Sequence, residues 1–294
     1  MLAPAPVFAL VTALCIGTAD FSSHYGLRHV RALSGAFFSV CFQWLTLGVI
    51  LSIRGKWEIG DWRGPAIFFL QGMLHPGIFF VFLFLSIARL GPARAITLKG
   101  TSPFFSVAIA LFFLGERPSP AIYVGLFLVA GGVMSLTAER GGRVRLGKEL
   151  AFPLIAAFLS GVGPNLAKLA LRYMNDPPLG VLFGVSGAMA TLFIANTVLS
   201  GKVGGRFWLR ASPFGHVLLF CPMGTLAAFG FIAYYTALSL GSVAVVAPLV
   251  QTAPFVAILL SRLLIQEQEG VNLRLVFSAV AVVLGAALIT TGRA

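Results

Sequence analysis

Long apolar segments recur along this chain, and each is close to the length that a helix needs to cross a lipid bilayer. A membrane-spanning helix takes about 20 mostly apolar residues. Ten such segments are separated by charged or Gly/Pro-rich breaks. They lie near residues 3–25, 34–53, 65–88, 95–114, 119–137, 150–171, 179–199, 214–238, 243–265 and 273–292. We therefore predict an all-α integral membrane protein with ten transmembrane helices.

The composition agrees with this prediction. The 294 residues are 58% hydrophobic and only 10% charged, whereas a soluble domain carries about a quarter of charged residues. Strands of a membrane β-barrel alternate apolar and polar residues, and segments such as LIAAFLSGV (residues 154–162) do not. The first apolar segment lacks a preceding basic region, so we interpret it as a span and not as a cleaved leader.

The net charge of +12 is scattered over the connections, apart from the linker ERGGRVRLGKE at residues 139–149. We expect that linker to be a solvated loop near anionic lipid headgroups, and we expect no nucleic-acid partner. The cysteines Cys15, Cys41 and Cys221 fall inside spans without the spacing of a metal site. They are therefore expected to be packing residues.

The two halves of the chain match each other, which indicates a duplication. The matching landmarks occur in the same order in both halves. They are Gly17 with Gly161, Leu90-Gly91 with Leu240-Gly241, Thr101-Ser102-Pro103 with Thr252-Ala253-Pro254, and Glu116 with Glu267. We predict a first five-helix repeat at residues 1–138, the basic linker at 139–149 and a second repeat at 150–294.

Each repeat holds five spans, so the second copy must enter the membrane from the opposite side. Inverted repeats of this kind are a common plan of secondary transporters, which bind their substrate near the midplane between the repeats. The duplication therefore predicts a central cavity and transport by alternating access.

The pattern resembles the EamA-type ten-helix branch of the drug/metabolite transporter superfamily. The resemblance rests on the paired repeats and on fourth spans that carry a small-x-x-Pro motif followed by Glu116 or Glu267. It implies a central cavity lined by the first, third and fourth helices of each repeat. It also implies export of amino acids or other metabolites, no cofactor, and both termini in the cytoplasm. We expect a monomer in the bacterial inner membrane, with protons as a further candidate partner.

The charge pattern and the resemblance disagree on orientation. About twice as many Lys and Arg residues lie in connections after odd-numbered spans as in the others. The positive-inside rule would then place both termini outside. Inverted repeats weaken this bias, so both orientations stay open.

Lys99 is a cation in the otherwise apolar fourth span, where charged residues usually face the bundle interior or a water-filled cavity. Ser102 and Ser106 follow at i+3 and i+7, which places polar side chains on the same helix face. Gly100 and Pro103 predict an irregular turn here. Lys99 could instead snorkel to the interface, but the polar face favours Lys99 and Ser102 as substrate-binding residues.

The first helix of each repeat carries a second polar group. Asp20 and His24 at i, i+4 can pair directly, for proton coupling or to lock two helices together. In the second half, Asn165 and Lys168 are candidate substrate-binding residues. The sequence GPN at residues 163–165 predicts a helix break that would expose backbone groups to a ligand.

Further candidates lie in the third, eighth and ninth spans. His75, with Gln71 four residues before it and Pro76 after it, is near the middle of its span. We predict that His75 contacts substrate or a proton, the alternative being a bond to a nearby backbone carbonyl, and that Gln71 is a substrate-binding residue. Gln251 is adjacent to the position equivalent to Lys99, so it is predicted to face Lys99 across the cavity. Of Tyr234 and Tyr235, one is expected to line the site and the other to pack, and Tyr234 is taken as the candidate substrate-binding residue.

Other polar residues are assigned structural roles. Gln43 and Trp44 are expected to make helix contacts, and Glu116 and Glu267 to cap the next helix or lock its loop.

The predicted function is transport of a small polar metabolite. Lys99 and Lys168 are opposed by one carboxylate within the spans, Asp20, which suits a substrate with a carboxylate or phosphate. Amino acids or related organic acids are the leading prediction, and export follows from the resemblance. Efflux of cationic drugs is the alternative, although it calls for an unopposed glutamate and an aromatic cage. An intramembrane enzyme is less favoured, because the zinc-protease motif H-E-x-x-H is absent.

Overall fold

The computed structural model of the protein describes residues 4–27, 29–55, 59–137, 148–200, 202–203, 206–209, 214–265 and 273–292. The first repeat contains α1 (Pro4–Gly26), α2 (Ala32–Arg54), α3 (Arg63–Gly72), η1 (Met73–Ile78), α4 (Phe79–Leu90), α5 (Pro92–Lys99), α6 (Ser102–Ile109), η2 (Ala110–Leu114) and α7 (Pro120–Thr137). The second contains η3 (Lys148–Leu150), α8 (Ala151–Leu171), α9 (Pro177–Ser200), the strands β1 (Lys202–Val203) and β2 (Arg206–Phe207), α10 (Phe214–Val217), η4 (Leu218–Phe220), α11 (Cys221–Leu240), α12 (Val243–Val250), α13 (Ala253–Ile265) and α14 (Leu273–Thr291).

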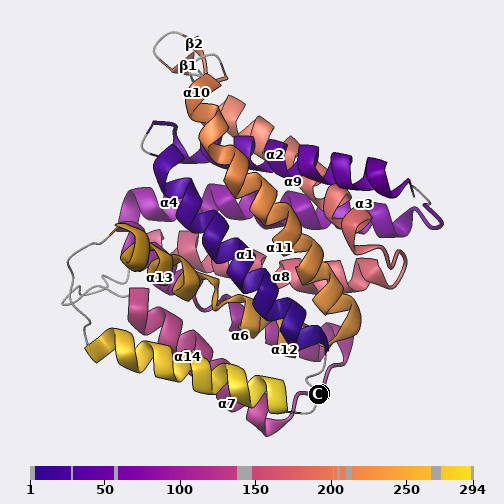
Figure 1. The fold of residues 1–294 in the computed structure, drawn as a ribbon, viewed down its shortest axis with the longest axis vertical. Helices are drawn as coiled ribbons and strands as arrows, with labels where there is room; N and C mark the ends of the chain where they lie inside the picture. Colours follow the sequence, from indigo (N-terminus) through magenta and orange to yellow (C-terminus); the bar gives the residue numbers. More distant parts are fainter. Residues whose placement is uncertain are drawn as a thin grey trace.

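These elements form the ten predicted spans, because several of them continue one another along a single path through the molecule (Figure 1). Within the described residues, seven segments are long and apolar enough to cross a membrane. Three shorter apolar helices, Pro120–Ser135, Val243–Ala257 and Val280–Thr291, belong to the remaining spans. The hairpin of β1 and β2 projects beyond the helices at one end of the molecule (Figure 1). The fold class predicted from the sequence is therefore confirmed.

The fourth span of each repeat is broken at an equivalent place. α5 ends at Lys99 and α6 begins at Ser102, while α12 ends at Val250 and α13 begins at Ala253. A proline is the second residue of both α6 and α13, and its missing N–H removes a helical hydrogen bond at the junction. The irregular turn predicted beside Lys99 is thus present, and its counterpart lies beside Gln251.

Contacts between connections show which helix ends share a face of the molecule. Arg54 after the second span bonds Asp176 after the sixth, with 2.7 Å between Nη1 and Oδ1. The rings of His29, after the first span, and His216, at the start of the eighth, stack with centroids 4.4 Å apart. The connections after spans two and six therefore meet, and so do the connections after spans one and seven. This is expected if the ten spans cross the membrane in alternating directions.

Helix packing between the repeats follows the twofold relation. α1 packs on α11, α12 and α13, α8 packs on α3, α4, α5 and α6, and the pairs α2 with α9 and α7 with α14 are also in contact. A Cβ built on Gly17 would lie 2.7 Å from Val256 Cβ, and one built on Gly161 would lie 2.6 Å from Phe105 Cβ. Phe105 and Val256 are equivalent in the repeat alignment, so each glycine meets the same position of the opposite repeat.

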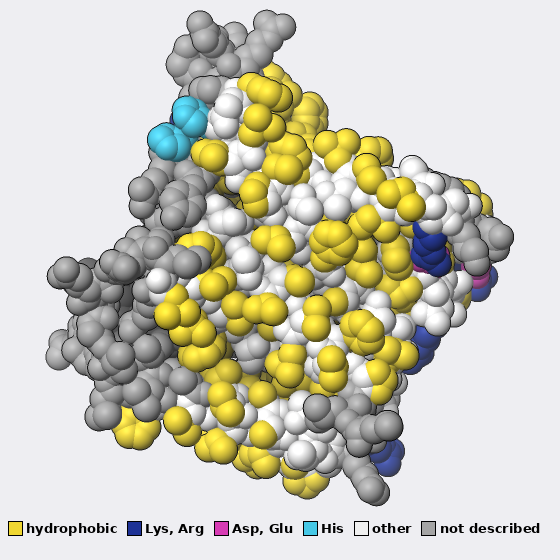
Figure 2. Space-filling view, in the orientation of Figure 1, with side chains coloured by type: hydrophobic (Ala, Val, Ile, Leu, Met, Phe, Trp, Pro, Cys, Tyr) yellow, Lys and Arg dark blue, Asp and Glu magenta, His cyan; other side chains and the backbone are white. Residues whose placement is uncertain are grey.

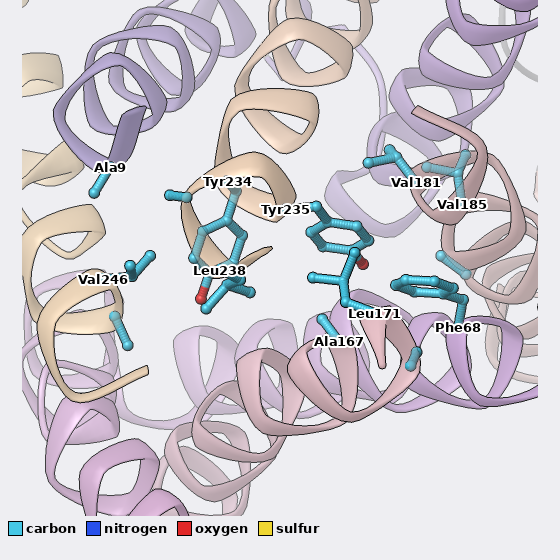
Figure 3. Close-up of a cluster of buried hydrophobic side chains, with 14 of the residues drawn as sticks. Ala9, Phe68, Ala167, Leu171, Val181, Val185, Tyr234, Tyr235, Leu238 and Val246 are labelled. Atoms are coloured by element: carbon cyan, nitrogen blue, oxygen red, sulfur yellow. The ribbon is translucent and has the colours of Figure 1, made fainter. Parts of the chain in front are cut away.

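The outer surface suits a lipid environment. Large apolar side chains such as Ile53, Phe112 and Phe113 are about four-fifths exposed. Figure 2 shows apolar side chains spread over the sides of the helices, with most of the visible Lys and Arg side chains at one edge and the visible histidines at the other. Inside, Tyr235 packs beside Phe68, whereas Tyr234 lies towards Val246 (Figure 3).

Candidate functional site

A cavity of about 230 Å³ lies between the two repeats. Its walls come from α1, α2, η1, α4, α5, α6 and α8 and from α11, α12, α13 and the turn between these last two. The first, third and fourth spans of both repeats contribute, and so does the second span, through α2. The polar or charged lining residues are Thr12, Asp20, Ser39, Gln43, His75, Lys99, Ser102, Ser106, Ser160, Tyr234 and Gln251.

Lys99 lies at the end of α5, where the final carbonyls of the helix favour a cation. Its Nζ donates a hydrogen bond to Oε1 of Gln251 over 3.3 Å. Nε2 of Gln251 donates in turn to Oγ of Ser102 over 2.6 Å. The predicted meeting of Lys99 and Gln251 across the repeats therefore occurs, and it joins the breaks of both fourth spans.

Two further groups surround the Lys99 ammonium. Asp20 from α1 lines the same cavity and interacts electrostatically with Lys99. The ring centroid of Phe79 lies 5.8 Å from Lys99 Nζ, within the range of a cation–π contact. The side chain of His24, the predicted partner of Asp20, lies outside the part of the chain that the structure describes.

His75 lines the cavity where the third span is interrupted. Its backbone is extended, with φ −140° and ψ 112°, as expected for a residue that precedes proline. Gln71 does not line the cavity. Its Nε2 donates to the backbone oxygen of His75 over 2.7 Å, and its Oε1 accepts a 2.6 Å bond from the hydroxyl of Tyr235. Gln71 therefore holds the main chain of His75 from behind the wall.

Of the two adjacent tyrosines, one lines the cavity and the other packs against a neighbouring helix, as expected. Tyr234 lines the cavity, whereas Tyr235 stacks on Phe68 with ring centroids 5.3 Å apart and bonds Gln71. Trp44 makes the predicted helix contact, since its Nε1 donates to Oγ of Ser186 on α9 over 3.1 Å.

Asn165 is buried beside the cavity and is not part of its lining. Its Nδ2 donates to the backbone oxygens of Ser106, over 3.0 Å, and Gly161, over 2.9 Å. The helix break predicted at residues 163–165 was wrong, because α8 continues through Pro164. Nδ2 of Asn165 bonds the backbone oxygen of Gly161, one turn earlier in α8, and α6 packs closely on α8 at Gly161.

Lys168 also lies outside the cavity lining. Its Nζ donates to the backbone oxygens of Leu238 and, over 2.7 Å, of Gly241, at the end of α11. Glu116 accepts hydrogen bonds from the backbone N–H groups of Val243, over 2.7 Å, and Ala244, over 2.9 Å, at the start of α12. Glu116 thus caps a helix as predicted, but that helix belongs to the opposite repeat. Glu267, its counterpart, lies outside the described residues.

Gln43 was expected to make a helix contact, yet it lines the cavity. Ala36, Ser39, Val40 and Gln43 lie on the same side of α2. Their i, i+3, i+4, i+7 spacing indicates that they share one helix face. The same spacing occurs at cavity walls and at helix interfaces, so it does not distinguish the two. Within the described residues, no group of three His, Cys, Asp or Glu side chains could hold a metal ion.

Comparisons with known proteins agree with this architecture. A model of the EamA-like transporter family matches residues 3–138 and 148–291. The chloroplastic phosphoenolpyruvate/phosphate translocator 3 of Oryza sativa subsp. japonica is 32% identical over 124 residues. That match covers 41% of this chain and 28% of the translocator. A solved structure, described only as a crystal structure of a protein, is 15% identical with a TM-score of 0.79, covers 98% of this chain and 96% of its own, and therefore shares the fold.

The family match covers almost the whole chain, and it agrees with the ten-span fold and the central cavity described above. These findings place the chain among multi-pass membrane transporters. The chain belongs to the EamA-like transporter family.

Proposed function

We propose that this protein is a secondary transporter that binds a small carboxylate- or phosphate-bearing metabolite in the central cavity. Amino acids and related organic acids are the leading substrates. The observation that carries this proposal is the position of Lys99, whose ammonium lies in the cavity at the junction of the two repeats. In a cavity screened from bulk water, a substrate anion beside this cation is held more strongly than at a protein surface.

The charges of the lining support amino acids in particular. Lys99 and Asp20 line one cavity, so a zwitterion could place its carboxylate near Lys99 and its ammonium near Asp20. The translocator from Oryza sativa is named for phosphoenolpyruvate and phosphate, which are anions. That name supports an anionic group in the substrate of this chain, although the match covers 28% of the relative.

Efflux of cationic compounds is less well supported. Phe79, Phe80 and Phe231 line the cavity and could contact an organic cation. Lys99 would repel that cation, however, and its ammonium already lies over the Phe79 ring. The apolar part of the lining then serves the carbon skeleton of the substrate.

Alternating access is the proposed mechanism, with residues 1–138 and 150–294 as the moving repeats. Equivalent helices of the two repeats make equivalent contacts, as Gly17 and Gly161 illustrate. Two arrangements of similar energy, open to opposite faces, are therefore expected. We further propose that the protein is a monomer of the bacterial inner membrane and acts as an exporter, with Asp20 as the candidate group for proton coupling.

A binding screen tests this function. Detergent-purified protein is heated with L-amino acids, dicarboxylates, phosphorylated metabolites or quaternary amines, and the shift in melting temperature is measured. A ligand that binds the folded state raises the melting temperature according to its Kd and concentration. Stabilisation by amino acids or organic anions supports the proposal, and stabilisation by quaternary amines alone contradicts it. Uptake into proteoliposomes then identifies which ligands are transported.

A further inference from the structure

Two buried polar groups of the cavity wall have no hydrogen-bond partner among the residues that the structure describes. Nε2 of Gln43 and Oγ of Ser106 make no such bond, although Gln43 is 4% exposed and Ser106 is 2% exposed. Both residues line the cavity. Buried polar groups in folded proteins are almost always hydrogen-bonded, so each exception calls for an explanation.

Gln43 is held in place by tight packing of its helix. A Cβ built on Gly224 of α11 would lie 2.4 Å from the backbone oxygen of Ser39 and 2.8 Å from the backbone nitrogen of Gln43. The backbones of α11 and α2 therefore approach closely at the turn that carries Gln43. This packing limits movement of the helix, so the backbone from which the Gln43 side chain extends has a fixed position.

Ser106 lines the same cavity from α6, another helix of the first repeat. The backbone oxygen of Ser106 accepts a bond from Asn165, and its α6 turn packs closely on Gly161. Ser106 lies one turn after Ser102 on α6, beyond the break that follows Lys99 at the end of α5. The Ser106 hydroxyl and the Lys99 ammonium come from different helices of the broken span and line one cavity, so they can contact different parts of one ligand.

We propose that Gln43 and Ser106 form a second polar subsite that determines which substrate side chain is accepted. This inference rests on the proposed function, in which the charged residues Lys99 and Asp20 bind the charged groups of the substrate. An amide N–H₂ group donates hydrogen bonds, and a hydroxyl can donate or accept. The subsite therefore takes a neutral oxygen: the hydroxyl, carbonyl or amide oxygen of a polar, uncharged side chain.

The preference for one substrate side chain over another depends on whether the ligand leaves the polar groups of Gln43 and Ser106 without a hydrogen bond. A substrate with an aliphatic side chain would displace water from the cavity without bonding Gln43 or Ser106. Leaving a buried donor unpaired in this way is costly, and sites built to bind a polar group reject analogues that lack it. The oxygen-bearing member of a matched ligand pair is expected to bind about tenfold more tightly.

The test uses ligand pairs that differ at one oxygen-bearing group: L-threonine with L-valine, L-serine with L-alanine, and malate with succinate. The Kd of each probe is measured by calorimetry for the wild type and for Gln43→Met, Ser106→Ala and Thr46→Val. Methionine keeps the approximate size of glutamine without the amide. Thr46 lies on the same helix as Gln43 but not in the cavity lining, so Thr46→Val is the control.

We expect the wild type and Thr46→Val to prefer the oxygen-bearing member of each bound pair. In Gln43→Met or Ser106→Ala the ratio of the two Kd values should fall towards one. An unchanged ratio in both cavity variants overturns the subsite and assigns the two groups to cavity water. Ser106→Ala removes a single oxygen, so it keeps the test available if Gln43→Met does not fold.

Failure of the proposed function would look different. If none of the six probes binds the wild type, the subsite is wrong, and the proposed function is wrong too if the wider screen finds no carboxylate- or phosphate-bearing ligand. If the probes bind and Lys99→Met abolishes binding of both members of every pair, the proposed function stands. The ratio in Gln43→Met and Ser106→Ala then decides the subsite alone.

Discussion

Lys168 and Glu116 bond the two sides of one corner, the turn between the end of α11 and the start of α12. Lys168 Nζ bonds backbone oxygens at the end of α11, and the carboxylate of Glu116 bonds backbone N–H groups at the start of α12. Each charge has the sign that the helix dipole favours at that terminus. Because Glu116 belongs to the first repeat, this corner is also a connection between the repeats.

We predict that removing either charge loosens this corner. Lys168→Met or Glu116→Gln should destabilise the protein by about 1–3 kcal/mol, the range for hydrogen bonds that involve charged groups. The double variant should lose less than the sum of the single losses, because both side chains stabilise one turn. Thermal unfolding of the four proteins in the same detergent measures this. Additive losses would mean that the two side chains act independently, and Lys148→Met at an exposed position is the control.

Replacing Lys99 tests the site. Lys99→Met should abolish the stabilisation that carboxylate ligands give to the wild type and should abolish their uptake into proteoliposomes. The variant should remain monodisperse, because methionine suits a partly apolar wall. Lys99→Arg keeps the charge and should retain part of the binding. Full uptake by Lys99→Met would contradict a substrate-binding role for Lys99.

The two neighbouring tyrosines offer a matched comparison. Tyr235→Phe removes the donor to Gln71 and leaves its buried oxygen unpaired, so a loss of about 1–3 kcal/mol in stability is expected. Tyr234→Phe removes a hydroxyl from the cavity lining and should change ligand Kd more than stability. Melting temperatures and Kd values of both variants measure the difference. Equal stability losses would contradict this division of roles.

The equivalent glycines can be tested as a pair. Gly17→Ala and Gly161→Ala each place a Cβ less than 3 Å from the fourth span of the opposite repeat, and overpacking of this kind costs about 1–3 kcal/mol. Both variants should therefore reduce stability and slow transport. A Cβ on Gly131 meets no atom within 4 Å, so Gly131→Ala is the control. Wild-type stability of both Gly17→Ala and Gly161→Ala would contradict the close approach of the helices.

The sequence by itself determined the membrane fold, because hydrocarbon requires about 20 apolar residues for each crossing helix and the chain contains ten such segments. It also identified the repeats, and the odd number of spans in each required that they be inverted. The break beside Lys99 could be predicted from Gly100 and Pro103, since glycine and proline interrupt helices for local reasons.

Only the tertiary structure decided which polar residues share the cavity. Lys168 and Asn165 carry the same sequence signals as Lys99, yet they bond backbone oxygens of neighbouring helices, while Gln43 lines the cavity. A helical pattern specifies which side chains share a face, but the rotation of that face depends on packing against other helices. Contacts such as Gly17 with Val256 and Gly224 with Gln43 set those rotations, and they join residues that are far apart in the chain.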